Sequence, residues 1–443
     1  MDEKILKDKS LLLILSYAPL GLGHLRVSDA FYHGLPPGIT PVLLGAQDKS
    51  LTTFYRFVSI HPITRWLMEH VQNGVLENVF TYLYRNYLQN HTTLLHQQFV
   101  TLLEERFEIP KTVLVIASHF GLAHQLGTIK KKLEEETSIK IFLVVQVTDD
   151  SPQHIWYVES ADIIFVPSAF TKKKLLEYAK NTDQKITNII VNPYPVDPLL
   201  SAKLTPHRFE ERLSQVNPEI SKSLRVMIPI SGAAVGMGYY KEIISYLTKK
   251  QPAFTFDIII KSAPYTKDFL ATITSYSGVN IHISPHHRGV VDMYMQAYKE
   301  ENFALEITKP SEQAFKIMLS PRDFGGTILL FTQPVGRQEY ENLNFIKRHH
   351  LIPSKQEKYH LWNLAANNDP IPDYLLNEAS NWRGLRLPQD PTLAGQFIWW
   401  CFKEKVFQRM MHHKLLEETE EIGSNGVERF WKNVTDQIQQ LSS

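Results

Sequence analysis

Short apolar runs that do not alternate with polar residues recur along the chain, and they constrain its fold more than any other feature. The runs span residues 11–15, 113–117, 141–145, 163–166, 226–230, 256–260 and 327–331. Strands with apolar side chains on both faces are typical of parallel sheets that are covered on both sides. Amphipathic segments such as 125–135 and 169–180 lie between the runs and are long enough for the helices that connect parallel strands. The sequence therefore predicts an α/β protein.

The length of the chain indicates more than one domain. Its 443 residues exceed the roughly 250–300 residues at which single hydrophobic cores stop growing. A proline-rich stretch at 192–198 separates the fourth and fifth apolar runs, so we expect two Rossmann-like halves with a linker between Pro193 and Leu224. We predict an N-terminal domain over residues 1–200, a C-terminal domain over 201–395 and C-terminal helices over 396–443, whose apolar surface must be covered by protein.

Charge and composition exclude several classes of protein. The 47 basic and 46 acidic side chains leave a net charge of +1, so no general field attracts nucleic acid, and we expect no nucleic-acid partner. A single cysteine, Cys401, cannot form an intramolecular disulfide. The first apolar run is shorter than the roughly 7–15 residues of a signal peptide core or the roughly 20 of a spanning helix. We therefore expect a cytoplasmic protein that is at most peripheral at a membrane.

Glycine-rich turns follow the first apolar run of each half. The first contains Gly21 and Gly23 and ends on His24, just before a helical pattern. The second contains Ser231, Gly232, Gly236 and Gly238. Glycines between a strand and a helix let backbone N–H groups approach an anion, and a histidine there is well placed for proton transfer. A tight turn with a structural histidine fits the first motif equally well, but the pair indicates a ligand held between the domains.

Two further motifs resemble a known family. Residues 306–312 read Glu-Ile-Thr-Lys-Pro-Ser-Glu, and residues 334–342 read Pro-Val-Gly-Arg-Gln-Glu-Tyr-Glu-Asn. They resemble the Ile-Thr-Lys-Pro-Gly-Gly, Glu-Ala and Pro-x-Pro-Gly-Gln-Glu motifs of glycosyltransferase family 28. That family includes the MurG-type N-acetylglucosaminyltransferases and, closer still, the monogalactosyldiacylglycerol synthases and processive diacylglycerol glucosyltransferases. The glycine turn at 21–24, Thr148-Asp149, His154, Trp156 and residues 161–168 are similar to its N-terminal motifs, so the resemblance covers about residues 10 to 350.

The resemblance implies a GT-B architecture, in which two Rossmann-like domains face each other across a cleft and the C-terminal helices pack back on the N-terminal domain. It also implies an inverting hexosyl- or N-acetylhexosaminyltransferase. Such an enzyme moves a sugar from a nucleotide diphosphate sugar, expected to be a UDP-sugar, to a hydroxyl of a lipid or lipid-linked acceptor. The N-terminal domain would handle the acceptor and the C-terminal domain the donor. The reaction needs neither a protein-bound metal nor another cofactor.

Site residues follow from the motifs and the resemblance together. His24 is the expected catalytic base, and Asp149 is its rival. The expected donor-binding residues are Ser231, Gly232, Gly236, Gly238, Lys309, Pro310, Ser311, Glu312, Gln338, Glu339 and Asn342. The expected acceptor-side residues are Gly21, Gly23, His119, His154 and Trp156. The two family glycines after Lys309 and Pro310 are absent, and Glu312 is the candidate for the family glutamate that holds the ribose hydroxyls.

Several interpretations stay open at this level. Asp149 and Asp150 fit turn and capping positions better than a metal site, and His119 and His124 fit either an acceptor pocket or local hydrogen bonds. The pairs at 286–287 and 349–350 fit solvated loops better than a metal cluster. Aromatic and basic residues over 54–88 fit a membrane interface or a helix packed on the sheet. The chain as a whole also fits an inactive GT-B protein that binds a nucleotide sugar or a partner, or a nucleotide-sugar epimerase.

Overall fold

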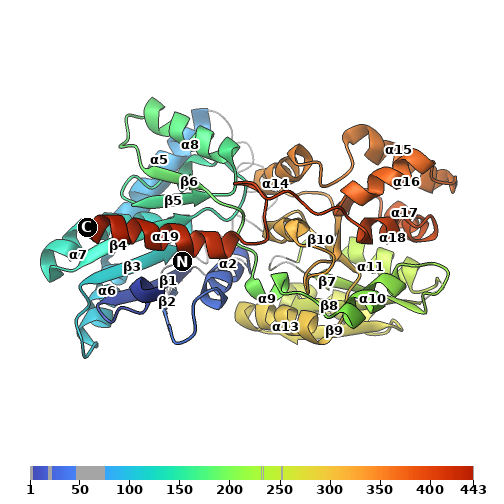
Figure 1. Ribbon diagram of the computed structural model, residues 1–443, viewed down its shortest axis with the longest axis horizontal. Coiled ribbons are helices and arrows are strands. Elements are labelled where there is room, and N and C mark those ends of the chain that lie inside the picture. The colour runs from blue at the N-terminus through green and yellow to red at the C-terminus, as the bar shows by residue number, and fades with distance from the viewer. Residues whose placement is uncertain are drawn as a thin grey trace. The chain divides into compact units, whose positions relative to one another are not determined.

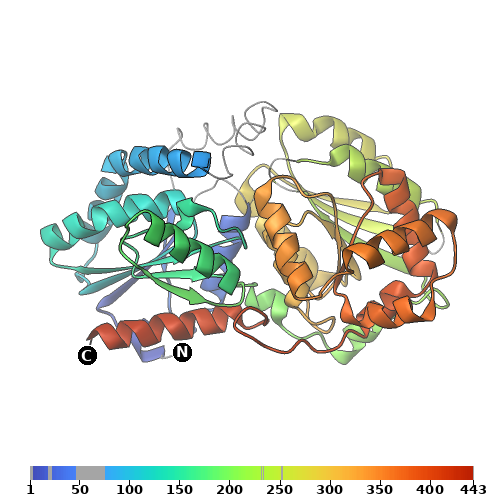
Figure 2. The ribbon, with the colours of Figure 1, turned by 90° about the horizontal axis from the view of Figure 1, so that it is seen from above.

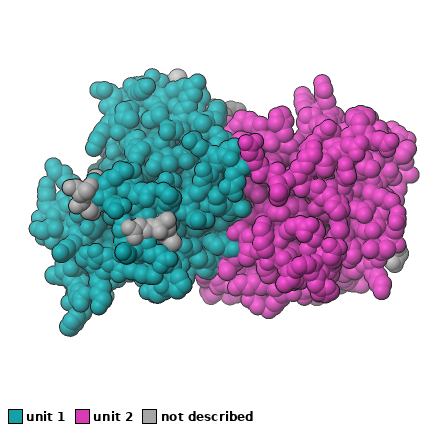
Figure 3. All heavy atoms as spheres, viewed as in Figure 1, with its two compact units in different colours: residues 1–198, 418–443 teal, residues 199–417 magenta. Residues whose placement is uncertain are grey.

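The computed structural model describes residues 3–17, 22–45, 75–230, 232, 234–250 and 253–442. The chain divides into two compact units (Figure 3). Unit 1 comprises residues 1–198 and 418–443, and unit 2 comprises residues 199–417. Each unit is described on its own.

The described part of unit 1 is built on a six-stranded parallel sheet with strand order β2-β1-β3-β4-β5-β6 (Figure 1). The strands are β1 (Leu11–Tyr17), β2 (Val42–Gly45), β3 (Thr112–Ala117), β4 (Lys140–Gln146), β5 (Ile163–Val166) and β6 (Asn188–Val191). The helices are α1 (Glu3–Leu6), α2 (Leu22–His33), α5 (Val75–Asn90), α6 (Thr93–Glu104), α7 (Phe120–Thr137), α8 (Ala169–Asn181) and α19 (Gly426–Ser442), with a 3₁₀ turn η1 at His154–Trp156.

Helices cover both faces of this sheet (Figure 2). On one face, residues of β1, β3 and β4 form a core with α5, α6 and α7, which includes Leu88, Phe99 and Leu133. On the other face, Phe430 of α19 stacks on Phe31 of α2 with ring centroids 3.9 Å apart. Burial on both faces explains why the central strands carry no alternating polar residues.

Unit 2 repeats this plan in its described residues, with strand order β12-β11-β10-β7-β8-β9 and all pairs parallel. The strands are β7 (Ser223–Pro229), β8 (Ala253–Lys261), β9 (Val279–Ser284), β10 (Leu305–Thr308), β11 (Ile328–Phe331) and β12 (Gly384–Arg386). The helices are α9 (Pro198–Ser201), α10 (Pro206–Gln215), α11 (Met237–Leu247), α12 (Lys267–Ile273), α13 (His287–Glu300), α14 (Arg337–Arg348), α15 (Lys355–Asn367), α16 (Asp373–Glu378), α17 (Pro391–Lys403) and α18 (Val406–Met411). Three 3₁₀ turns are η2 (Pro264–Thr266), η3 (Glu312–Met318) and η4 (Ala379–Asn381).

Two parallel sheets, each with its own helices and core, confirm the predicted α/β class and its two Rossmann-like halves. The residues expected as one group of C-terminal helices, 396–443, divide between the units. α17 and α18 bury Phe397, Trp400 and Phe407 in the core of unit 2. Only α19 packs on unit 1, where the Trp431 indole N–H donates to the Phe31 carbonyl at 3.1 Å. Residues 418–443, which end in α19, therefore form the part of the C-terminal segment that belongs to unit 1.

No helix in the described ranges is long and apolar enough to cross a membrane.

Candidate functional site

His24 lies half-buried in the first turn of α2, and its ring has a defined orientation. Its Nδ1 atom is 2.7 Å from the carbonyl oxygen of Ser118, which follows β3. Because a carbonyl oxygen only accepts hydrogen bonds, Nδ1 carries the proton and Nε2 of the neutral ring holds a lone pair. A histidine in this tautomer can take up a proton at Nε2, as a general base must.

Two buried serines fix the backbone around His24. The hydroxyl oxygens of Ser28 and Ser118 are 2.9 Å apart. Each hydroxyl also lies within hydrogen-bond distance of the His24 carbonyl, at 3.0 Å for Ser28 and 3.2 Å for Ser118. This network ties the first turn of α2 to the carboxyl end of β3. The position of the imidazole is therefore set by the sheet and not by a loop alone.

Aromatic rings surround His24. The His119 ring meets it edge to face with centroids 4.8 Å apart, and the Trp156 ring lies 6.3 Å away. Phe120 stacks on His119 at 4.7 Å. The indole N–H of Trp156 is buried and finds no hydrogen-bond partner in the described part of the chain. The structure thus brings together His24, His119 and Trp156, which the sequence assigned separately.

His119 and His124 are neutral, locally bonded histidines. Nδ1 of His119 accepts the backbone N–H groups of Gly121 and Leu122 at 3.1 and 3.4 Å, so this side chain caps α7. Burial, and the proximity of His24, hold the pKa of His119 well below its usual range. His124 contacts the carbonyl oxygen of Ile155 at 2.8 Å, and burial lowers its pKa to about 4. Of the two alternatives left open by the sequence, local hydrogen bonding describes both residues.

The remaining acceptor-side candidates lie as follows. His154 stacks on Tyr178 of α8 at 4.2 Å, and its Nδ1 is 2.7 Å from Asn78 Oδ1 of α5, so it joins η1 to both helices. Asp149 is half-buried in the turn after β4. Its neighbour Asp150 is fully buried and accepts the hydroxyls of Thr171 and of Ser168, which is the N-cap of α8. Gly23 lies beside His24 in α2, and Gly21 lies outside the described residues.

In unit 2, the two motif stretches meet at the carboxyl edge of the sheet. Lys309 directly follows β10, and its Nζ lies 2.5 Å from Oε1 of Glu339 in the first turn of α14. The other oxygen of Glu339 accepts the backbone N–H of Val335 at 2.6 Å. Burial raises the pKa of Glu339, while the charge of Lys309 opposes this increase and the nearby Glu312 adds to it. Lys309 is therefore part of an ion pair and not an isolated point charge.

Other motif residues support the same turn. The side-chain amide of Asn342, which is fully buried, donates to the Pro310 carbonyl at 3.2 Å. Ser311 precedes η3, and Glu312 is the half-exposed first residue of η3. Gly336 has a φ of +85° and directly precedes α14, and the space that a side chain of this residue would enter is open. Gln338 is half-buried in the first turn of α14. The backbone N–H groups at the start of α14 form an electropositive end next to Glu312 and Lys309.

The glycine turn of unit 2 lies at the same edge. Gly236 has a φ of +89° and caps α11. No backbone atom of another segment lies within 4 Å of the place where a side chain on Gly236 or Gly238 would begin. Gly232 accepts the Tyr265 hydroxyl on its carbonyl oxygen at 2.7 Å. Ser231 lies outside the described residues. Open space beside Gly238 is what the approach of a ligand requires.

Sequence reasoning missed His287, which it grouped with solvated histidines. His287 begins α13, and its Cε1 atom is 3.1 Å from the position of a Cβ on Gly232. Nε2 lies 3.0 Å from Nζ of Lys261, which only donates, so the ring proton is on Nδ1. Burial and Lys261 lower the pKa of His287 to about 4, and Nδ1 is buried with no partner among the residues described. Its N–H is thus a spare donor beside the glycine turn.

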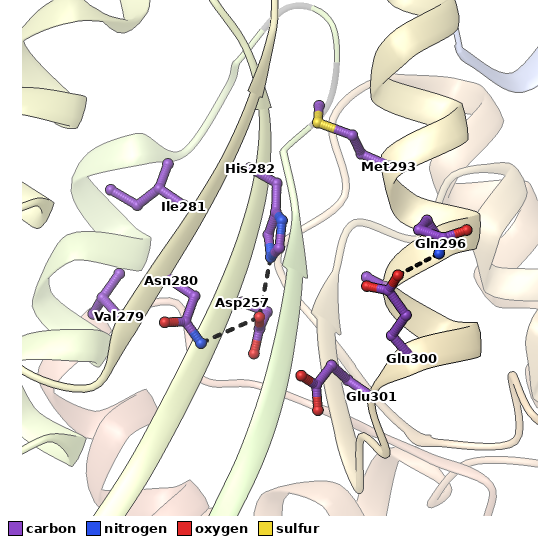
Figure 4. A pocket seen from close by; sticks show the side chains of 10 residues that line it. Asp257, Val279, Asn280, Ile281, His282, Met293, Gln296, Glu300 and Glu301 are labelled. Carbon is purple, nitrogen blue, oxygen red and sulfur yellow. Dashed lines mark hydrogen bonds and ion pairs between the residues drawn. The ribbon is translucent and has the colours of Figure 1, made fainter.

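A separate pocket of about 550 Å³ opens between β9 and α13 (Figure 4). Its inner carboxylate, Asp257, accepts from His282 Nε2 at 3.0 Å, Asn280 Nδ2 at 3.3 Å and Arg225 at 3.3 Å. No residue of the candidate site contributes to its lining, and Asp257 is occupied by these internal bonds. We assign this pocket no part in the chemistry.

Comparisons with known proteins show that the chain is similar to solved structures only. No family model matches the chain, and no curated protein matches it. It is similar to a putative UDP-N-acetylglucosamine 2-epimerase from Listeria monocytogenes, with 11% identity, 97% of each chain covered and a TM-score of 0.48. It is also similar to UDP-GlcNAc 2-epimerase from Neisseria meningitidis bound to UDP-GlcNAc (13% identity, 96% of this chain and 99% of that one, TM-score 0.48).

MurG from Acinetobacter baumannii is a further likeness, with 10% identity, 97% of this chain and 99% of that one covered, and a TM-score of 0.40. These likenesses concern the fold, and what this chain does depends on its own residues.

Proposed function

We propose that this chain transfers a sugar from a nucleotide diphosphate sugar to a hydroxyl acceptor, with the donor on unit 2 and the catalytic base on unit 1. The observation that carries the proposal is the Lys309–Glu339 ion pair of 2.5 Å. It unites two motif stretches, 306–312 and 334–342, that both resemble donor-binding motifs of glycosyltransferase family 28. The Asn342 bond to Pro310 joins the same stretches a second time.

The donor site is supported by the groups at the carboxyl edge of this sheet. A diphosphate needs N–H donors and positive charge, which the start of α14, the turn at Gly232 and the spare N–H of His287 offer. Lys261, which donates to His287, adds a cation nearby. We assign the ribose hydroxyls to Glu312, which is half-exposed, because the carboxylate of Glu339 already accepts from Lys309 and Val335. UDP is the expected nucleotide.

The base is supported by the geometry of His24. Its Nδ1–H is held on Ser118, so Nε2 can receive the proton of the acceptor hydroxyl. In the proposed step the acceptor oxygen attacks the anomeric carbon, the bond from that carbon to the diphosphate oxygen breaks, and the proton passes to Nε2. The diphosphate leaves with the electron pair of the broken bond. Attack opposite the leaving group inverts the anomeric centre.

A lipid or lipid-linked acceptor is supported by the surface of α5. Tyr82, Leu83 and Tyr87 are exposed there, Leu83 to 60%, while Tyr84 and Leu88 pack into the core of unit 1. An interfacial helix exposes such a mixture of aromatic and aliphatic groups. Arg85 of the same helix is half-buried and donates to Gln184 at 2.8 Å, so its charge does not belong to this exposed surface. Phe54, Tyr55, Phe57, Arg65 and Trp66 lie outside the described residues.

The proposal is tested first by donor binding. A ligand that binds the native state raises its melting temperature with the logarithm of saturation, so UDP-, GDP- and TDP-sugars should rank by affinity, with a UDP-sugar first. Glu312→Ala should weaken nucleotide binding by about 1.5–3 kcal/mol, the range for hydrogen bonds to a charged group. Glu341→Ala, on α14, is the matched control. Unchanged affinity of the Glu312 variant in calorimetry contradicts the ribose assignment, and no shift with any nucleotide sugar contradicts the function.

A further inference from the structure

Unit 2 carries a group of cationic side chains at one end of its sheet that the proposed function does not use. We call Lys347, Lys355, Lys358 and Arg386 the basic cluster. Lys347 is in the last turn of α14, Lys355 and Lys358 are in the first turn of α15, and Arg386 is the last residue of β12. In a chain with a net charge of +1, such a local accumulation of charge calls for a physical reason.

Aromatic and polar contacts hold two of these cations in place. Nζ of Lys358 lies 4.0 Å from the ring centroid of Tyr359 and 4.7 Å from that of Trp362. The Trp362 indole N–H donates to the backbone carbonyl of Arg386 at 2.9 Å, which ties α15 to the end of β12. One guanidinium nitrogen of Arg386 donates to Gln333 Oε1 at 3.0 Å. Its Nε–H is buried and has no hydrogen-bond partner within the described ranges.

Counter-charges are missing from this arrangement. In the part of the chain that the structure describes, none of the four cations forms an ion pair with a carboxylate. The nearest acid in sequence, Glu357, is engaged in the capping box of α15, where it accepts the Ser354 N–H at 2.7 Å. Burial, followed by the charges of Arg386, Lys358 and Lys355, lowers the pKa of Lys347. The cations therefore repel each other in the ligand-free protein, and a bound anion would relieve this repulsion.

Within the cluster, Arg386 lies at the same edge of the sheet as the donor motifs but not within them. Arg386 is in register with Phe331 of β11, and Phe331 is in register with Thr308 of β10. Two strand spacings of about 4.8 Å place the backbone of Arg386 roughly 10 Å from Thr308, the residue before Lys309. Lys309 is neutralised by Glu339, whereas the cluster cations are not.

We infer that the basic cluster is a binding site for a phosphate-type oxyanion, distinct from the donor site, in which Arg386 donates to two oxygens and Lys347 and Lys358 supply point charges. The planar guanidinium, with one donor already oriented by Gln333, matches the geometry of a phosphate, and the ammonium groups add charge without directional demand. The inference does not depend on sugar transfer and stands even if the chain transfers none.

Calorimetry with inorganic pyrophosphate at low salt tests the site on the full chain. Wild-type protein should bind pyrophosphate saturably, and Arg386→Gln, Lys347→Gln and Lys358→Gln should each weaken binding by about tenfold or more, as expected for loss of a charge-assisted contact. Lys249→Gln, an exposed lysine of the same unit, should bind as the wild type does. Lys309→Gln shows whether pyrophosphate binds at the donor site instead. Without pyrophosphate, the melting temperature of Lys347→Gln should be no lower than that of the wild type, because the substitution removes a repulsive charge. Weaker pyrophosphate binding by this variant is then not a result of unfolding.

Three results would overturn the inference: no saturable binding by the wild type, wild-type affinity in Arg386→Gln, or a loss of binding confined to Lys309→Gln. A competition experiment with lipid vesicles then shows whether the phosphate group belongs to a lipid or to a soluble molecule. Two kinds of vesicle are compared, phosphatidylcholine alone and phosphatidylcholine mixed with phosphatidylglycerol. If only the mixed vesicles displace pyrophosphate, the ligand is a lipid headgroup. Failure of both vesicles to compete, with pyrophosphate bound, supports a soluble phosphate ester.

Discussion

The residue with the most defined chemistry is His24, whose tautomer is fixed by the Ser118 carbonyl. His24→Ala should lower kcat by roughly 10²–10⁴-fold, the usual contribution of a positioned acid or base, and leave nucleotide affinity near that of wild type. His96→Gln is a matched control, because His96 pairs with Glu136 at the surface of the same unit. Steady-state kinetics with the preferred donor provide the measurement. An active His24 variant together with an inactive Asp149→Ala variant would transfer the role of base to Asp149.

His124 makes the stability of unit 1 depend on pH. Burial lowers its pKa to about 4 in the folded protein, whereas an unrestrained imidazole has a pKa of 6.5. The unfolded chain therefore binds more protons between these values, and the free energy of unfolding should fall as the pH decreases from 6.5 to 4, by about 3 kcal/mol for this one group. Above pH 6.5 its contribution is complete. His119 acts in the same direction.

Urea unfolding between pH 4.5 and 7 measures this dependence. His124→Gln keeps an N–H donor for the Ile155 carbonyl without a titrating group, so its stability should vary less with pH than that of wild type. His91→Gln, the same substitution at an exposed position of unit 1, is the matched control. Equal slopes in wild type and His124→Gln would contradict a neutral His124.

At the scale of single residues, the sequence predicted which residues belong to a site better than it predicted the contacts that each side chain makes. The motifs marked Lys309, Glu339 and Asn342 as members of one site. In the structure Lys309 pairs with Glu339, and Asn342 donates to the carbonyl of Pro310, the residue after Lys309. The pairing of Lys261 with His287 could not be predicted, because Lys261 ends β8 and His287 follows β9, so the two residues meet only through the order of the sheet. Nor could spacing show that Lys309 is neutralised by Glu339.

Among the elements, the apolar runs predicted the strands inside the two sheets except β10, which is fully buried, and they predicted none of the edge strands. The runs at 113–117 and 141–145 correspond to β3 and β4, which lie inside the sheet of unit 1. β9 and β12 lie at the edges of the sheet of unit 2, where β9 is partly exposed and β12 has only three residues. Edge strands need less apolar surface, so they leave a weaker pattern in the sequence.

Helix α5 presents two faces with different consequences. Tyr84 and Leu88 pack in the core, whereas Tyr82, Leu83 and Tyr87 are exposed. If this face contacts lipid, replacing Tyr82 and Leu83 with serine should reduce co-sedimentation with anionic vesicles and change the melting temperature little, because both side chains are exposed. Tyr87 is kept, because its ring contacts His91 with centroids 4.1 Å apart. Phe107→Ser, at a fully exposed position outside α5, should sediment as the wild type does. Equal sedimentation of all three proteins would contradict a lipid contact through α5.

Helix α19 is expected to be an integral part of unit 1 although it is the last element of the chain. Phe430 contacts the rings of Phe31 and Phe165, and Trp431 is fully buried. Phe430→Ala should lower the free energy of unfolding by about 3–5 kcal/mol, the usual loss for a buried aromatic ring. Glu428→Ala, on the exposed side of α19, is the control. Denaturant unfolding provides the measurement, and a loss below about 1 kcal/mol would contradict the packing role.

On the scale of the whole molecule, the chain length and the proline-rich stretch at 192–198 predicted two halves, and the units divide between Pro198 and Leu199. The division of the C-terminal segment was not predictable. The apolar residues at 397–411 and at 427–438 have similar helical spacings, and only the folded cores decide that the first group belongs to unit 2 and the second to unit 1.

Turnover of a labelled UDP-sugar panel in the presence of a membrane-lipid extract tests the central claim most directly. We predict a labelled glycolipid and free UDP in equal amounts, with a product of inverted anomeric configuration, and loss of both in His24→Ala. Binding of UDP-sugar without any product would contradict transfer and favour an inactive binding protein. Release of UDP and free sugar without need for the lipid would contradict transfer as well and favour an epimerase.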